Sequence, residues 1–326
     1  MNIRVPFSPP QASTLAPQID LLYLYLISVT IFFVCVIFSV ALFFTVKYKR
    51  RHPDQIGVPL HGSLVLELTW TIIPLLIAMS MFLWGSVLFF KSFRPPQNAE
   101  EIYVVGKQWM WKIQHPEGRR EINELHVPLG HPIRLKMTSE DVIHSFFVPA
   151  FRVKMDVVPG RYTSAWFEAT QTGSFHLFCA EYCGTKHSGM IGKVVVLQEE
   201  DYQEWLASGR EPSVPVSISG EELFKKNRCD TCHHDNSGAL GPNLAGIYGK
   251  EVQLADGRKV TAGDDYIRES ILKPGSRIVA GYAPVMPTYQ GQLSEEQIFQ
   301  IIAYIKGLGE PTPPQADVPD AAPAEA

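Results

Sequence analysis

Two long stretches of the chain lack charged side chains. Residues 21–46 form the first uncharged run, and residues 68–90 form the second. A helix of either length crosses the roughly 30 Å hydrocarbon layer of a membrane. The sequence therefore predicts a transmembrane helix hairpin over residues 21–94. A cleaved signal peptide is the alternative for the first run, but the run is too long for one, and the basic sequence KYKRR follows it directly.

The orientation of this hairpin follows from its cations. Lys47, Lys49, Arg50 and Arg51 lie between the two runs, and loops rich in Lys and Arg stay in the cytoplasm. Residues 1–20 are then expected as an N-terminal extracytoplasmic segment. Everything after the second run is expected on the same outer side.

The pattern changes to short apolar runs after residue 94. Runs such as EIYVVGK, PIRLKM and GKVVVL are rich in β-branched and aromatic residues, and turn-forming Pro and Gly separate them. They predict an antiparallel β-sandwich over residues 95–200. Residues 201–216 are expected to form a linker that contains a short helix and then a Pro- and Ser-containing connector.

Helical periodicity returns in residues 217–309. Ser219 with Glu222, and Ser294 with Gln297, have the spacing of capping boxes that open helices. The segment after the second box keeps its apolar residues on one helical face, namely Ile298, Ile301, Ile302, Ile305 and Leu308. An all-α domain is expected here. Residues 310–326, rich in Pro and Ala, are expected to be a disordered tail.

Composition excludes several classes of protein. The chain has 326 residues and a net charge of −4, so it is long enough for several domains and has no basic excess for binding nucleic acid. Four of the five cysteines fall in two metal-type motifs. The fifth, Cys35, lies in an apolar run and is expected to act as a small hydrophobic residue. No disulfide framework is indicated.

Soft metal ligands gather in the segment FCAEYCGTKHSGM. It contains Cys179, Cys183, His187 and Met190, and His144 lies upstream in EDVIHSFFVP. One thiolate, two imidazoles and a weak Met ligand describe a single blue-copper site. Only the thiolate count is doubled here, which indicates two copper ions that share two sulfurs and transfer electrons. A disulfide between the two cysteines is the alternative.

A second redox motif lies in KKNRCDTCHHD. Cys229, Cys232 and His233 form the C-x-x-C-H signature of covalent haem c attachment, with the histidine as proximal iron ligand. Alone, the motif also fits half of a zinc site or a redox dithiol. No second cysteine pair remains to complete a zinc site. The neighbouring His234 is expected to be solvated.

The first motif closely resembles the binuclear copper (CuA) centre in subunit II of haem–copper cytochrome c oxidases. The resemblance implies that the ligands are Cys179, Cys183, His144, His187, Met190 and the main-chain carbonyl of Glu181. The segment GKQWMW resembles the family's aromatic segment, which implies that Trp109 lies over the copper centre and receives electrons. Met110 stands where the family usually has Tyr. A core aromatic pair of Trp109 and Trp111 is the alternative.

Three carboxylates match family positions that border the catalytic subunit or lead protons into it. Glu67, in LELTWTIIP, resembles the residue at the mouth of a proton-uptake path, and an ordinary interfacial carboxylate is the alternative. The resemblance implies that the Glu181 side chain reaches a magnesium or manganese ion shared with that subunit. A solvated loop carboxylate is the alternative. Asp156 matches a family position at the same boundary, and a plain salt bridge is the alternative. Three histidines lack ligand-like spacing and are expected at the surface or at strand ends: His126, His131 and His176.

Residues 217–309 are similar to class I cytochromes c. The similarity places Met286, in GYAPVMPTY, as the axial ligand opposite His233, and a core Met is the alternative. Ligation by His and Met gives a haem of raised potential that transfers electrons.

From about residue 20 to residue 309 the chain resembles subunit II of caa-type cytochrome c oxidases. The resemblance implies that a donor such as a cytochrome c reduces haem c, which reduces CuA, which reduces subunit I. There O2 becomes water with proton translocation. Subunit III and membrane lipid are further expected partners, and a bacterial inner membrane is the expected location. The alternatives are the same subunit of a CuA-type nitric oxide reductase, or a membrane-anchored carrier with no fixed catalytic partner.

Overall fold

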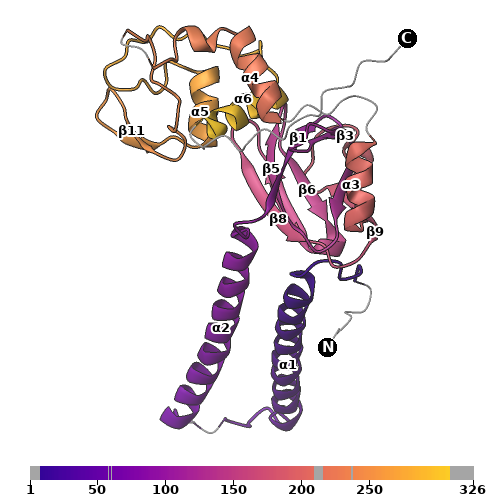
Figure 1. The fold of residues 1–326 in the computed structure, drawn as a ribbon. Coiled ribbons are helices and arrows are strands. Elements are labelled where there is room, and N and C mark those ends of the chain that lie inside the picture. Colours follow the sequence, from indigo (N-terminus) through magenta and orange to yellow (C-terminus); the bar gives the residue numbers. More distant parts are fainter. Residues whose placement is uncertain (1–7, 58, 60, 209–215, 236–237, 309–326) are drawn as a thin grey trace.

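The chain forms a helix hairpin, a β-sandwich and a mainly helical domain, in that order (Figure 1). This order confirms the predicted fold class. The computed structural model describes residues 8–57, 59, 61–208, 216–235 and 238–308. The tail predicted over residues 310–326 lies outside the described residues.

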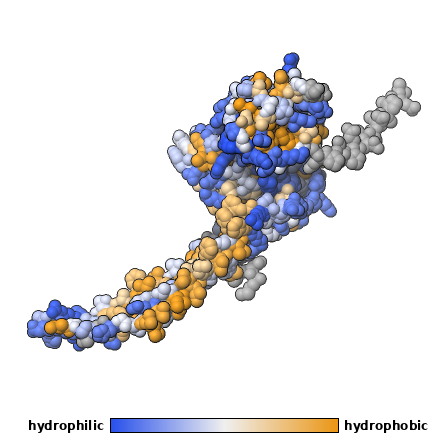
Figure 2. All heavy atoms as spheres, turned by 90° about the vertical axis from the view of Figure 1, so that its left-hand side faces the viewer, coloured by the Kyte–Doolittle hydropathy of each residue, from blue (hydrophilic) through white to orange (hydrophobic). Residues whose placement is uncertain are grey.

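The hairpin consists of α1 (Ala16–Lys47) and α2 (Leu64–Phe93). Both helices are long and apolar enough to cross a membrane. Each extends past its uncharged run, because polar residues such as Asp20 and Glu67 continue the helical turns at the ends. Figure 2 shows apolar surface along the hairpin and polar surface at its far tip. The side chains of Tyr25 and Ser80 join the two helices through a hydrogen bond of 2.6 Å.

The segment before α1 is built into the sandwich. Ala12 N donates to Ala150 O at 2.9 Å, and Thr14 N donates to Glu168 O at 3.1 Å. Below them, Arg152 Nε donates to Asp20 Oδ1 at 2.8 Å, which ties the outer end of α1 to the same region. The sandwich, the segment before α1 and the adjacent end of α1 therefore form one connected body.

The sandwich has two sheets of five strands, in the orders β3-β2-β1-β5-β8 and β4-β10-β9-β6-β7. Large apolar side chains from both sheets, such as Trp111, Phe146 and Phe167, fill the space between them and are fully buried. The strands are β1 (Glu100–Lys107), β2 (Met110–Gln114), β3 (Arg120–Ile122), β4 (Glu124–Pro128), β5 (Pro132–Ser139), β6 (His144–Val148), β7 (Val153–Val157), β8 (Thr163–Glu168), β9 (Gly173–Cys179) and β10 (Ile191–Leu197).

The expectation of purely antiparallel pairing is wrong for two strand pairs. Strand β1 runs parallel to β5, and β4 runs parallel to β10. In both pairs the intervening chain returns from elsewhere in the sandwich, so the neighbours in space are not joined by a hairpin.

Helix α3 (Glu199–Ala207) packs on the sandwich, although it was expected within a linker. Its Tyr202 is buried, and its Trp205 ring stacks on His126 with a centroid distance of 4.3 Å. His126 lies within β4 and contacts Glu121, so the expectation of a surface or strand-end histidine is wrong. The aromatic side chains of α3 account for both differences, because they are more stable against the sandwich than in water.

The helical domain contains α4 (Val216–Lys226), α5 (Asp264–Leu272) and α6 (Glu295–Gly307). The Ser294–Gln297 capping box opens α6 as predicted. Ser219 does not open α4, which already begins at Val216, where the backbone N–H donates to Pro116 O at 2.9 Å. A small hairpin of β11 (Glu251–Gln253) and β12 (Lys259–Thr261) adds strands that the all-α prediction lacked.

Candidate functional site

The sulfur-rich motif lies at one end of the sandwich, where four backbone segments meet. Cys179 ends β9, His144 begins β6, and Met190 immediately precedes β10. Between the two cysteines and β10, a short 3₁₀ turn carries His187. The strands fix three of the candidate positions, and the loop between β9 and β10 adds the rest.

The side chains of this motif converge. Cys179 Sγ lies 3.7 Å from Cys183 Sγ and 3.9 Å from His144 Nδ1. Cys183 Sγ lies 3.5 Å from His187 Nδ1 and 3.8 Å from Met190 Sδ. The two sulfurs are too far apart for a disulfide, whose S–S bond is about 2.05 Å, and all five cysteines are free thiols.

Glu181 contributes its main chain to the same cluster. Its carbonyl oxygen lies 3.2 Å from Cys179 Sγ, while its side chain is exposed. All six groups that the resemblance names therefore meet at one place. The two sulfurs face each other in the middle, and each has its own imidazole nitrogen within 3.9 Å.

The protonation of the two thiols differs. Burial opposes ionisation of Cys179, but its contacts with His144 and the Glu181 backbone lower the pKa to about 6. Burial and then the neighbouring Cys179 thiolate raise the pKa of Cys183 to about 12. The two directions favour ionisation of Cys179 before Cys183, and a metal bound by both sulfurs would displace the remaining proton.

Residues without a metal-binding role hold these ligands in place. Asp141 Oδ1 lies 2.8 Å from His144 Nε2, and Gln108 Nε2 donates to Cys183 O at 2.8 Å. Gly106 packs against the His144 ring, since a Cβ added there would lie 2.8 Å from His144 Cδ2. Sequence reasoning missed these three residues. The spacing of Asp141, three positions before a ligand, was the available signal.

Trp109 and Asp156 lie near the ligand loop or its strands. The Trp109 ring packs over Gly184, where an added Cβ would lie 3.3 Å from Cζ2, and it is half-buried. Asp156 accepts from Ser145 Oγ at 2.8 Å and from Lys154 Nζ at 3.2 Å, so the plain salt bridge is present. Glu67 is exposed in the first turn of α2, far along the chain from the cluster.

The second motif borders an apolar cavity in the helical domain. Cys229 and Cys232 lie on the turn after α4. His233 Nδ1 lies 2.8 Å from Pro242 O, and Gly241 packs against the ring, where an added Cβ would lie 2.7 Å from Cε1. Burial lowers the pKa of His233, which favours the neutral imidazole that ligates a metal.

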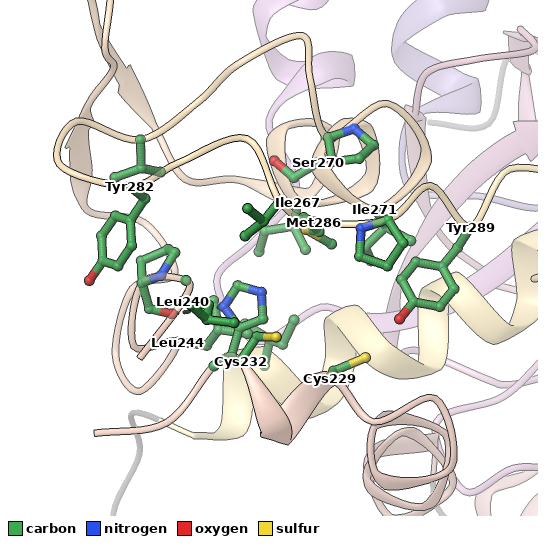
Figure 3. A pocket seen from close by; sticks show the side chains of 18 of the residues that line it. Cys229, Cys232, Leu240, Leu244, Ile267, Ser270, Ile271, Tyr282, Met286 and Tyr289 are labelled. Atoms are coloured by element: carbon green, nitrogen blue, oxygen red, sulfur yellow. Dashed lines mark hydrogen bonds between the residues drawn. The ribbon is translucent and has the colours of Figure 1, made fainter. Parts of the chain in front are cut away.

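Met286 lies across this cavity from the two cysteines (Figure 3). Figure 3 places Ile267 and Ile271 of α5 beside Met286. The remaining wall is mostly apolar and comes from α4, α6 and the loops, including Phe224, Leu244, Ile301 and Ile305. A flat apolar macrocycle between a histidine and a methionine fits such a cavity.

Three family profiles match the chain in order. The profile described as "Cytochrome C oxidase subunit II, transmembrane domain" matches residues 5–85. "Cytochrome C oxidase subunit II, periplasmic domain" matches residues 120–198, and "Cytochrome C oxidase, cbb3-type, subunit III" matches residues 218–305.

Individual proteins agree with the profiles. Cytochrome c oxidase subunit 2 of Alkalihalophilus pseudofirmus is 30% identical over 287 residues, which are 84% of this chain and 82% of that protein. Cytochrome c oxidase subunit 2 of Thermostichus vulcanus is 28% identical over 251 residues, covering 60% of this chain and 76% of that protein. The crystal structure of the periplasmic domain of subunit II of cytochrome oxidase of Bradyrhizobium japonicum is 32% identical, covers 37% of this chain and 100% of that chain, and has a TM-score of 0.35.

A membrane hairpin that carries an outer sandwich with clustered sulfur ligands and a cytochrome domain defines a membrane-anchored electron-transfer subunit. The chain belongs to the cytochrome c oxidase subunit II family, in a form with a fused C-terminal cytochrome c domain. Copper and haem c are the cofactors that this family and this domain imply.

Proposed function

We propose that this chain is the subunit through which electrons reach a terminal cytochrome c oxidase. An outer donor reduces haem c, the electron passes to a binuclear copper (CuA) centre, and it continues to subunit I. There O2 is reduced to water with proton translocation. One observation carries the proposal: the six candidate ligands lie within 3.9 Å of a neighbouring ligand atom at one end of the sandwich.

The donor set fits two copper ions. Cys179, Cys183, His144 and His187 would hold them through two thiolates and two imidazoles. Met190 and the Glu181 carbonyl would complete the pair as weaker ligands. When bound, the centre supplies a reversible one-electron change. The rigid strands on either side keep the ligands in place through that change, and the buried surroundings exclude water.

The cytochrome domain would hold haem c through four residues. Cys229 and Cys232 would form the thioethers, and His233 and Met286 would ligate the iron. The apolar wall keeps water from the iron, which favours electron transfer over binding of a substrate.

Other residues serve the proposed assembly. The indole of Trp109 lies over the copper ligand loop, where an outer donor can approach it, and this supports its role in accepting electrons. The exposed Glu181 carboxylate is available for a magnesium or manganese ion shared with subunit I. Subunit III, membrane lipid and a cytochrome c or similar donor complete the proposed partners, in the inner membrane of a bacterium with both redox domains on the outer side.

Oxygen uptake by the purified complex tests this function. The complex would be isolated through a tag on the C-terminal tail and fed with ascorbate and a mediator. We expect rapid, cyanide-sensitive uptake that Cys179→Ser abolishes and that Cys35→Ser, a thiol in the hairpin, retains. No O2 uptake from a preparation with intact haem and copper spectra would contradict the proposal. Nitric oxide consumption by that preparation would identify the reductase instead.

A second experiment addresses proton uptake at Glu67, which lies exposed at the cytoplasmic end of α2 in the proposed orientation. Glu67→Gln should slow turnover of the assembled enzyme and leave both metal spectra unchanged. Glu251→Gln, an exposed carboxylate of the cytochrome domain, is the matched control. Equal turnover in the two variants would remove Glu67 from the mechanism.

A further inference from the structure

Strand β1 is buried on both of its faces. Residues 102–105 form a continuous apolar run in which Ile102 and Val104 face the sandwich core. Tyr103 and Val105 point the other way and belong to a separate apolar cluster with Phe299 and Val216 of the cytochrome domain. Continuous apolar runs are typical of strands covered on both sides. The apolar sequence of β1 thus indicates that another part of the protein covers its outer face.

Helix α6 is that partner. Its Phe299 is buried against Tyr103 at 4.7 Å and Tyr162 at 4.8 Å between ring centroids. Ile301 and Ile305 leave the helix on another face and line the haem cavity. Helix α6 therefore contacts the copper domain with one face and the haem cavity with another. Phe299 lies off the apolar stripe that packs the cytochrome core.

Charged pairs surround this apolar contact. Lys136 Nζ lies 2.7 Å from Glu101 Oε1 and 2.8 Å from Asp264 Oδ2, although its side chain is only 3% exposed. On another side of the contact, Lys112 Nζ bridges Glu140 at 2.7 Å and Glu296 of α6 at 2.9 Å. Separation of the domains would break the ion pair between Lys136 and Asp264, so this pair forms only in the docked arrangement.

The connector is anchored at both ends to one turn of the copper domain. The guanidinium of Arg119 donates to Trp205 O at the end of α3. Val216 N, at the start of α4, donates to Pro116 O at 2.9 Å. The cytochrome domain is therefore held at the first residue of its first helix as well as through α6.

A buried indole lies beneath the docked face. Trp111 precedes Lys112 in β2, points into the core and meets the His144 ring edge-on at a centroid distance of 5.9 Å. The added Cβ at Gly106 would lie 3.4 Å from the same indole, which shows how tightly the indole packs beside the ligand. The contact from α6 through Lys112 to a copper ligand is thus continuous.

We propose that the cytochrome domain delivers its electron while docked on this face, through the first sheet at Trp111, and does not leave to dock over Trp109. In the step one electron leaves the reduced haem iron and reduces the oxidised copper centre; no bond forms or breaks and no proton is transferred. Trp109 then serves only donors that are not part of the chain. This inference rests on the proposed function, because it requires both cofactors.

Covalent locking tests the inference on the full-length subunit with both cofactors. A zero-length carbodiimide cross-linker joins amines to carboxylates in ion pairs, so it should join Lys112 to Glu296, and mass spectrometry would map the product. Lys112→Gln treated in parallel lacks that link and reports the effect of all other modifications. Flash reduction of the haem then measures the rate at which the copper absorption bleaches. We expect the cross-linked subunit to keep the rate of the untreated one.

The route is tested by two matched indole replacements. Trp111→Phe should slow the internal step and leave the copper spectrum in place, whereas Trp166→Phe, a buried indole at the hairpin end of the sandwich, should not. A cross-linked subunit with both spectra but no internal transfer would overturn the inference, as would slowing by Trp109→Phe alone. Loss of the copper or haem spectrum in the unmodified subunit would count against the proposed function instead.

Discussion

The two redox sites of this chain are built in opposite ways. The proposed copper ligands lie at strand ends and on one loop of the sandwich, and each has an atom 3.2–3.9 Å from an atom of another. The proposed haem ligands border a cavity whose apolar walls are the core of the cytochrome domain. The copper-site residues Cys179, Cys183 and Met190 belong to a core that mostly non-ligating residues build, whereas the walls of the haem cavity cover the cofactor itself.

This difference separates the two cofactors in their effect on folding. Buried apolar residues such as Trp111, Phe146 and Phe167 hold the sandwich together with or without copper. In the cytochrome domain, Ile267, Ile301 and Ile305 both pack the core and face the cavity. Loss of copper should abolish electron transfer and leave the sandwich folded, whereas loss of haem should unfold the cytochrome domain.

The largest expected effect comes from blocking haem attachment. Cys229→Ala with Cys232→Ala should unfold the cytochrome domain, because its apolar walls lose the surface that they cover. Rapid proteolysis between α4 and α6 and a loss of helical circular dichroism would report this. Cys179→Ser, the control at the other site, should leave the sandwich resistant to protease. Equal protease resistance of the cytochrome domain with and without haem would break the comparison.

The next effect concerns packing of the cytochrome domain itself. Gly220 of α4 crosses α6 so closely that an added Cβ would lie 1.9 Å from Gln300 O. Gly220→Ala should lower the free energy of unfolding by about 1–3 kcal/mol. Gly307→Ala, on α6 with no atom within 4 Å of the added Cβ, should be neutral or slightly stabilising. Thermal unfolding of the haem-loaded protein measures both, and equal midpoints would contradict the crossing geometry.

A subtler pair of variants sharpens the contrast between the sites. Gly106→Ala pushes on His144, and Gly241→Ala pushes on His233. The copper site has no covalent hold on its metal, so Gly106→Ala should weaken copper retention by about 10–100-fold. The proposed thioethers would hold the haem covalently, so Gly241→Ala should alter its absorption spectrum without releasing it. Copper and haem content per chain distinguish these outcomes, with Gly189→Ala and Gly275→Ala as unhindered controls.

The smallest effect is the pH response of the contact between the two domains. The pKa values of Glu101 and Asp264 are lowered in the folded protein. Burial alone would raise them, but the ammonium groups of Lys136 and Lys306 outweigh that effect. A carboxyl whose pKa is lowered in the folded state adds stability above its unfolded pKa, near 4 for these groups. That stability is lost as the pH falls through the pKa of the folded state, because the protonated carboxyl no longer attracts the ammonium groups.

Acid below about pH 4 should therefore loosen the docked domain before it unfolds the sandwich. Small-angle scattering should show that the radius of gyration increases as the pH falls from 7 to 3. Glu101→Gln should flatten the response to acid, while Glu251→Gln, an exposed carboxylate, should not. An unchanged radius across this range would show that the ion pairs do not govern the contact.

The sequence was sufficient for the parts that depend on local spacing. Cys179, Cys183, His187 and Met190 fall within one short segment, and the C-x-x-C-H motif is contiguous, so the clusters that they form could be predicted. His144 lies 35 residues before Cys179, so its spacing alone gave only a candidate ligand, and the family resemblance added it to the ligand set. The helix hairpin and the Ser294 capping box likewise depend on neighbouring residues.

The parts that escaped prediction depend on contacts between distant segments. Nothing in the periodicity of residues 199–207 showed that Trp205 would cover His126, and Gly106 gave no sign that it faces His144. The parallel pairing of β1 with β5 also requires knowledge of the chain path. Two signals were present: the unbroken apolar run of β1, and Phe299 lying off the stripe of α6.

The segment that precedes α1 sets an order for the making of this protein. Arg152 holds Asp20 from 132 positions away, and Ala12 bonds to Ala150. In the proposed orientation, residues 12–20 must therefore cross the membrane and wait there while the second helix and half of the sandwich are synthesised. Only then can the strands close over them. The sandwich can therefore be completed only after the N-terminal segment has reached the same side of the membrane.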